Sequence, residues 1–235
     1  MGLRRLGLIK ISTMIFILCL CSIVKADEFE DKYIFFLGTV AAYNTISGDF
    51  NGHNTVFNLR GTTANAGNVI PITILPSIDS APAYGFVGGV NNGNVSFEFS
   101  YITSYHNAAT IFNGSSYKRT ANYSIISLDG KYYLNSDSAF QPFAQFGIAF
   151  PWLKLNQHSE YVSTALYNTM MRFYGLGLDL GGGIAYTILP IRITLSVYLR
   201  SLLFTDIVSG ASDNSEYFPY GGLDVIPSVS VVYVF

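Results

Sequence analysis

The sequence predicts an all-β fold: an up-and-down antiparallel barrel of eight strands that crosses a membrane, preceded by a cleaved signal peptide. Three observations carry this prediction. Half of the residues are hydrophobic and only 12% are charged, although the chain begins with an export leader. Apolar and polar residues alternate in segments of about ten residues. The joins between these segments are alternately short and long, which is typical of a membrane-spanning meander.

The export leader occupies residues 1–26. Three basic residues within the first ten positions precede an apolar run of roughly fourteen residues, which is shorter than the roughly 20 that a membrane-spanning helix needs. The small residue Ala26 marks the expected cleavage site, so the mature domain is predicted over 27–235. Both cysteines, Cys19 and Cys21, lie in the leader, and we therefore expect no disulfide in the mature domain.

Charge and motif content exclude several classes of protein. Without the leader, nine basic and 15 acidic side chains remain, and this acidic balance does not attract nucleic acid. The sequence has no metal-ligand spacing, no nucleotide-binding glycine loop and no nucleophile elbow. We therefore predict no cofactor, no metal site and no catalytic residue.

Turn and loop residues bound eight predicted strands. From the N-terminal end they are 33–44, 83–91, 95–106, 120–134, 141–153, 172–187, 191–204 and 222–235. The first join, 45–82, is long, whereas the second is the short Asn91–Asn94 turn and the sixth is the tight corner at Ile188–Pro190. Short joins therefore gather at one end of the barrel and long joins at the other.

The two faces of each strand indicate lipid outside and a packed interior. Over 172–187, one face is apolar, with Tyr174, Leu176, Leu178, Leu180, Ile184 and Tyr186. The other face is small or polar, with Gly175, Gly177, Asp179, Gly181, Gly183 and Ala185. Small residues suit the crowded lumen of a barrel of about eight strands. The apolar faces are therefore expected to meet lipid.

The same alternation directs six charged side chains into the lumen. They are Glu98, Asp129, Lys131, Asp179, Arg192 and Arg200. A charge in a narrow lumen is costly without a partner, so we expect these three acids and three bases to pair. The pairs either hold the strands in register or form a gate in a narrow water path, and the sequence leaves both readings open.

The last strand ends in four large residues on one face. They are Val229, Val231, Tyr233 and Phe235. An apolar, aromatic ending is unusual for a chain terminus, which is commonly polar and frayed.

With these features the chain resembles the small outer-membrane β-barrels of the OmpA, OmpX and opacity-protein kind. The matching stretches are YGFVGGVNNGNVSFEFSYI, QPFAQFGIAF, the glycine-rich sixth strand and the terminal Tyr233-Val234-Phe235. The resemblance implies the outer membrane of a Gram-negative-type bacterium, with periplasmic termini and extracellular long loops. It also implies that Val229, Val231, Tyr233 and Phe235 form the signal that the barrel-assembly machinery reads.

The three histidines, His53, His106 and His158, map to the end with the long joins. Enzymes of the outer membrane place catalytic histidines near that rim, and His106 with Ser104 has the residue types of a nucleophile and its base. The spacing matches no motif of those enzymes, so we interpret the histidines as scattered polar loop residues.

Aromatic residues gather near the strand ends, where their rings favour the level of lipid headgroups. They are Tyr101, Tyr105, Tyr132, Tyr133, Trp152, Tyr174 and Tyr186. The first long join differs, because its patch Val69–Pro76 is too apolar for a freely solvated loop. This patch is expected to pack over the barrel mouth, meet lipid or contact a partner.

The sequence thus favours a structural and interaction protein of the outer membrane, a surface antigen or adhesin-like barrel. Its expected partners are outer-membrane lipids, the barrel-assembly machinery, and host or environmental ligands at the long loops. The main alternative is a narrow porin or an OmpW-like channel for small hydrophobic molecules. A lipid- or peptide-modifying enzyme, such as an acyltransferase, deacylase or protease, is the third reading.

Overall fold

The computed structural model describes residues 33–52, 55–57, 72–112, 114–135, 138–156, 170–209 and 215–235. The predicted signal peptide lies outside these residues. Within the described ranges, no helix is both long enough and apolar enough to cross a membrane. Every strand belongs to one compact unit, residues 34–235.

Eight long strands build this unit. They are β1 (Ile34–Asn44), β5 (Ala81–Asn92), β6 (Val95–Phe112), β7 (Ser115–Tyr133), β8 (Phe140–Leu155), β9 (Met171–Ile188), β10 (Ile191–Ser209) and β11 (Ser215–Val234). Three short strands lie in the first long join: β2 (Thr55–Phe57), β3 (Ile72–Ile74) and β4 (Ser77–Ile78). The sequence analysis did not predict the short strands, because two or three residues carry too little alternation to be recognised.

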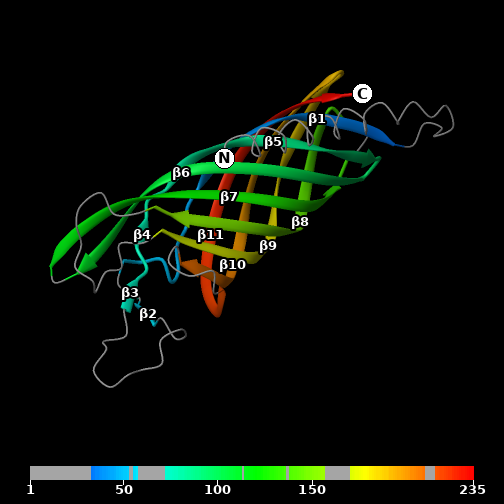
Figure 1. Ribbon diagram of the computed structural model, residues 1–235. Coiled ribbons are helices and arrows are strands. Elements are labelled where there is room, and N and C mark those ends of the chain that lie inside the picture. The colour runs from blue at the N-terminus through cyan, green and yellow to red at the C-terminus, as the bar shows by residue number, and fades with distance from the viewer. Residues whose placement is uncertain are drawn as a thin grey trace, which may run out of the picture. The chain divides into compact units, whose positions relative to one another are not determined.

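The sheet closes into a ring where β1 pairs with β11. Figure 1 shows the blue β1 beside the red β11 at this closure. All neighbours in the ring are antiparallel, which confirms the predicted eight-stranded meander. Following the pairs once around the ring from Arg192 leads back to β10 at Leu202, ten residues further on. This stagger tilts the strands, and a ring of this size has room inside only for side chains.

The predicted alternation between outer and inner faces is confirmed. On β9 the outward Leu176, Leu178 and Leu180 are 45%, 52% and 65% exposed, whereas the inward Asp179 and Ala185 are wholly buried. Large apolar side chains therefore cover the outside of the ring, which is the reverse of a water-soluble barrel.

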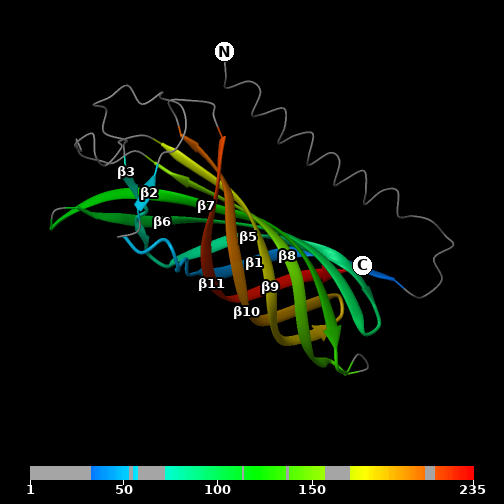
Figure 2. The same ribbon diagram turned by 90° about the horizontal axis from the view of Figure 1, so that it is seen from below.

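The strands extend further at the long-join end than the sequence predicted. Residues 107–119 were expected to form a loop, but β6 continues to Phe112 and β7 begins at Ser115, with Thr110 opposite Tyr117. The Asn, Gly and Ser residues here are typical of loops and masked an alternation in which Ala108 and Thr110 face inward and Asn107 faces out. This hairpin projects beyond its neighbours, and the C-terminus lies at the opposite end (Figures 1 and 2).

Much of the inner face at the long-join end is apolar, which corrects the expectation of a small and polar lumen along its whole length. Ile46, Phe50, Leu75 and Ile78 of the first join enter the barrel mouth, and we call them the loop plug. They pack against inward residues of the wall, among them Ile125, Leu153, Leu155, Met171, Phe173, Leu202 and Phe204. The plug explains this apolar lining, because the wall here meets side chains of the loop rather than water.

Phe50 is the centre of the plug. Its ring meets the rings of Phe173 and Phe204 edge-on, with centroids 5.5 Å and 5.4 Å away. Leu75 belongs to the predicted Val69–Pro76 patch and enters this cluster. It is wholly buried. Residues 69–71 of that patch lie outside the described residues. The patch was expected to pack over the barrel mouth, meet lipid or contact a partner, and Leu75 packs in the barrel mouth.

Candidate functional site

A row of mostly charged residues winds along the inside of the barrel on neighbouring strands. In register, each of these residues lies opposite the next around the ring: Glu98 on β6, Asp129 on β7, Gly147 on β8, Asp179 on β9, Arg200 on β10 and Asp224 on β11. We call this set the lumen row. It contains four acids, one base and Gly147 on six adjacent strands, a grouping produced by the registers of five strand pairs.

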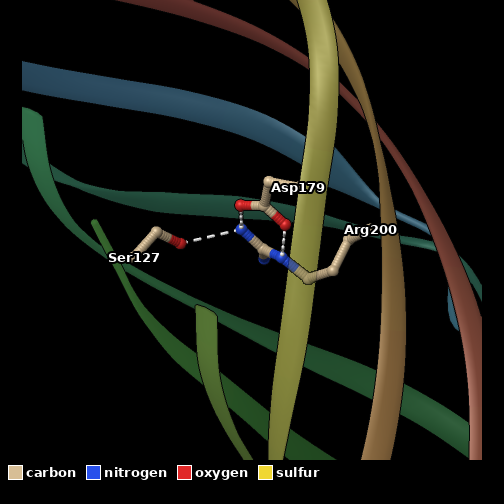
Figure 3. Close-up of polar contacts among 3 residues, drawn as sticks. All are labelled: Ser127, Asp179 and Arg200. Carbon is tan, nitrogen blue, oxygen red and sulfur yellow. Dashed lines mark hydrogen bonds and ion pairs between the residues drawn. The ribbon is translucent and has the colours of Figure 1, made fainter. Parts of the chain in front are cut away.

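Arg200 forms the strongest link of the row (Figure 3). Its Nε and Nη2 each donate to an oxygen of the Asp179 carboxylate at 2.6 Å. Nη2 also donates to Ser127 Oγ on β7 at 2.8 Å, so the guanidinium reaches from β10 across the lumen. Both charged side chains are wholly buried. A bidentate, charge-assisted pair with a third hydrogen bond fixes this geometry.

Lys131 and Glu98 form the second pair. Lys131 Nζ lies 2.7 Å from Glu98 Oε2, and it also sits over the ring of Phe143, 4.7 Å from the centroid. Both side chains are at most 10% exposed. This pair joins β6 to β7 on the short-join side of the Arg200 link.

Asp129 and Arg192 have no acid–base partner among the described residues. Arg192 Nε donates to Thr187 Oγ1 at 3.1 Å, and its guanidinium lies 5.6 Å from the centroid of the Phe36 ring. Asp129 occupies space that Gly147 leaves open, because a Cβ at position 147 would collide with the Asp129 carboxylate. Three acid–base pairs were expected. The structure has two among its described residues, and Asp129 and Arg192 belong to neither.

Asp224 is a buried lumen acid that the sequence analysis did not name. It is wholly buried, and its Oδ1 accepts a 2.7 Å hydrogen bond from the backbone N–H of Thr45. The alternation along the strand could have identified Asp224 as an inward residue, because it lies on the same face as Ser228. Asp224 ties the start of the first join to β11 just beyond Pro227, where the β1 ladder has already ended.

Ser104 and His106 are hydrogen-bonded to each other. His106 Nδ1 lies 2.6 Å from the carbonyl oxygen of Asp79, which can only accept, so Nδ1 carries the proton in the neutral ring. Ser104 Oγ therefore donates to His106 Nε2 at 2.7 Å. Asn44 Nδ2 donates to the same Oγ at 3.2 Å.

This chain of contacts has the order of a nucleophile and its base, but it is closed to solvent. Ser104 is 1% exposed and His106 is 2% exposed, so no substrate reaches the hydroxyl in this conformation. What the contact does here is hold the segment after β4 against β6. His53 and His158 lie outside the described residues.

Four outward residues make the predicted face of the last strand. Val229, Val231, Tyr233 and Phe235 are 39%, 45%, 49% and 69% exposed. The backbone N–H of Phe235 donates to the carbonyl oxygen of Phe35 on β1 at 2.9 Å. The final residue is therefore part of the closing seam of the ring.

Most of the predicted aromatic residues lie on the outer wall, and Tyr133 is a correction. It is 1% exposed and faces the lumen, where its ring packs against Phe143 at 5.5 Å. Tyr132, its neighbour, points outward and is 53% exposed. Because side chains alternate along a strand, Tyr132 and Tyr133 point to opposite faces. The prediction grouped them because both lie near a strand end.

No family model and no curated protein sequence matches the chain. Among solved structures, Neisserial surface protein A resembles it with a TM-score of 0.50 and 11% identity over 86% of this chain and 97% of that chain. OprG from Pseudomonas aeruginosa has a TM-score of 0.48 and 13% identity, covering 87% and 96%. A major outer membrane protein from Thermus thermophilus has a TM-score of 0.47 and 11% identity, covering 86% and 99%. At such identity the likeness to the first structure shows the fold, that of a small outer-membrane β-barrel.

Proposed function

We propose that the protein is a closed barrel of the outer membrane with a structural and surface-interaction role. The observation that carries the proposal is the filled lumen, in which the Arg200 link and the loop plug lie in series. A barrel whose lumen is filled with side chains offers no passage, so its function lies in its outer wall and its joins.

The two lumen barriers differ in chemistry. At the Arg200 link, Arg200 and Asp179 are wholly buried, and Arg200 is bonded across the lumen to Ser127. At the long-join end, Phe50, Leu75 and the apolar wall leave the rings of Phe173 and Phe204 wholly buried as well. A hydrated ion would have to break a charge-assisted pair and also displace an apolar cluster.

Membrane placement rests on the exposed apolar wall together with the fold. Side chains of this kind in water would form an exposed patch far larger than soluble monomers carry. By the same proposal the long joins are extracellular, the termini are periplasmic, and the C-terminal face of Val229, Val231, Tyr233 and Phe235 is read during assembly. The partner at the long joins is a host or environmental ligand.

A channel for small hydrophobic molecules is the second candidate, favoured by one feature of the wall. An open apolar depression of about 540 Å³ spans β1, β9, β10 and β11, with Ala41, Gly182 and Pro227 in its lining. The β1–β11 ladder ends beside this depression, at the pair Ala42–Ser228. The next residue of β11 is Pro227, which has no N–H and cannot continue the ladder. Uptake of an apolar solute by vesicles that carry the barrel tests this candidate.

Planar-bilayer recording tests the closed lumen. The refolded mature protein is expected to show no steady conductance. Because the Arg200 link and the loop plug lie in series, ions are expected to pass only in the double variant Arg200→Gln/Phe50→Ala. The matched control is Arg192→Gln/Phe50→Ala, which keeps the Arg200 link and removes a buried arginine without an acidic partner among the described residues. Steady conductance of the unmodified protein that Arg200→Gln leaves unchanged would establish a pore and overturn the proposal.

A further inference from the structure

Two cations face each other on the outer wall beyond the aromatic residues of the long-join end. Lys154 on β8 lies opposite Arg172 on β9 in register. Both point outward, and Arg172 is exposed. Neither forms an ion pair with an acid among the described residues. Like charges directly opposite on one face of a sheet repel, so this pair costs stability unless an anion lies between them.

The pair lies at a defined depth relative to the apolar band. On β9 the outward rings of Tyr174 and Tyr186 bound the exposed leucines, and Arg172 is the next outward position beyond Tyr174. The twelve residue-to-residue steps from Tyr174 to Tyr186 span about 40 Å, or about 30 Å along the barrel axis at a tilt of about 40°. This matches an apolar band of about 25 Å with an aromatic girdle on each side. Arg172 and Lys154 therefore lie at the level of lipid headgroups.

Along β6, β7, β8 and β9 no acid shares the outer face with the two cations, because Glu98, Asp129 and Asp179 all face the lumen. On the next strand, β10, Asp206 lies opposite Tyr174 in register. Just inside the pair, Trp152 lies opposite Tyr174, and its ring stacks on Tyr101 with centroids 5.9 Å apart. The surface thus combines an apolar wall, an aromatic platform and, outermost, two cations.

We propose that Lys154 and Arg172 bind the phosphate of a membrane lipid whose acyl chains lie along the wall of β8 and β9. The anion offsets the repulsion between the cations, and the planar guanidinium of Arg172 can hold two phosphate oxygens at once. The position beside the apolar band favours a lipid over a soluble phosphate, because only a lipid also covers the leucines below. The inference rests on the membrane placement proposed above.

Trp152 is the only tryptophan of the chain and lies two residues from Lys154, so it reports on the site directly. The refolded mature protein in neutral micelles is titrated with phosphatidic acid brominated in its acyl chains, and separately with brominated phosphatidylcholine. Bromine quenches tryptophan at contact, so the quenching curves compare how the two lipids occupy this wall. Phosphatidic acid is expected to quench at a lower mole fraction, by about fivefold for each cation that contributes.

The double variant Lys154→Gln/Arg172→Gln is expected to remove the preference for phosphatidic acid. Lys118→Gln is the matched control, because Lys118 is also an exposed lysine but lies further out, on the projecting β6–β7 hairpin. This control should keep the preference. Each protein is first shown to migrate as a heat-modifiable barrel, so a failure of membrane folding is seen separately from a failure of lipid binding.

Three results would overturn the inference. Equal quenching of the unmodified barrel by both lipids would show that the cations do not select a phosphate. Loss of the phosphatidic acid preference on adding inorganic phosphate at the same concentration would show a site for soluble phosphate instead. A preference that the double variant retains would place the binding elsewhere on the barrel.

Discussion

Arg200 and Asp179 lie directly opposite each other on β10 and β9 and are joined by two hydrogen bonds of 2.6 Å inside the barrel. The pair is wholly buried, and two further acids of the lumen row, Asp129 and Asp224, lie on β7 and β11. The guanidinium is thus the one base that the register places in a row of four acids.

Reversal of Arg200 should therefore be costly. We expect Arg200→Glu to lower the free energy of unfolding by about 3–5 kcal/mol, the range for breaking a buried ion pair. Adding Asp179→Arg should restore part of the loss, because the pair re-forms with its charges exchanged. Urea unfolding in micelles measures both variants. If Arg200→Glu unfolds at the same urea concentration as the unmodified protein, Arg200 does not hold the lumen together.

The loop plug should act as a barrier separable from the Arg200 link. Phe50→Ala removes the ring that meets Phe173 and Phe204, and truncating a buried phenylalanine costs about 3–5 kcal/mol in a well-packed core. We expect the first join to loosen, which limited proteolysis detects as faster cleavage near residue 50. Conductance should stay low, because the Arg200 link remains. Large conductance in Phe50→Ala alone would show that the plug is the only barrier.

The hydrogen bond of His106 predicts a pH effect on the first join. His106 lies beyond the outward Tyr105, outside the membrane-spanning part of β6, and burial lowers its pKa below the ordinary value of 6.5, although the contact with Asp79 acts in the opposite direction. Protonation therefore favours the state in which the ring is exposed. The stabilisation is full above pH 6.5 and is lost as the pH falls below that value toward the lowered pKa.

Hydrogen exchange of the Asp79 amide measures this effect, because that N–H donates to the Asn107 carbonyl oxygen at 2.9 Å beside His106. After correction for the intrinsic rate, its protection should fall on acidification. In His106→Gln the protection should no longer depend on pH. Unchanged protection of the native protein down to about pH 5 would contradict the assigned role of the histidine.

The last residue should matter for assembly more than for export. Deleting Phe235 removes its backbone contact to Phe35 and the exposed ring next to Tyr233. We expect the truncated protein to be exported and processed but to insert poorly into the outer membrane, as measured by cell fractionation and heat-modifiable migration. Phe235→Tyr, which keeps an aromatic ring, is the matched control. Normal insertion of the truncated protein would show that the final aromatic is not read during assembly.

The strands and their two faces could be predicted from the amino-acid sequence, because a period of two is a local property of the chain. Leu176 and Asp179 could be assigned to opposite sides of the wall before any neighbour was known. The same reasoning directed Arg200 and Glu98 inward. It was misled at 107–119 and at Tyr133, where composition or closeness to a strand end took the place of the alternation.

Which inward residues contact one another follows from how the strands pair and fold together. Arg200 lies opposite Asp179 because the tight corner at Ile188–Pro190 sets the register of the β9–β10 hairpin. Its second contact, to Ser127, forms only because the closed ring brings β7 and β10 together across the lumen. The approach of Phe50 to Phe173 likewise requires the first join to turn back into the barrel mouth. Asp224 gained its partner Thr45 from the same closure. Contacts of this kind depend on bringing distant segments together, and local periodicity carries no information about their register.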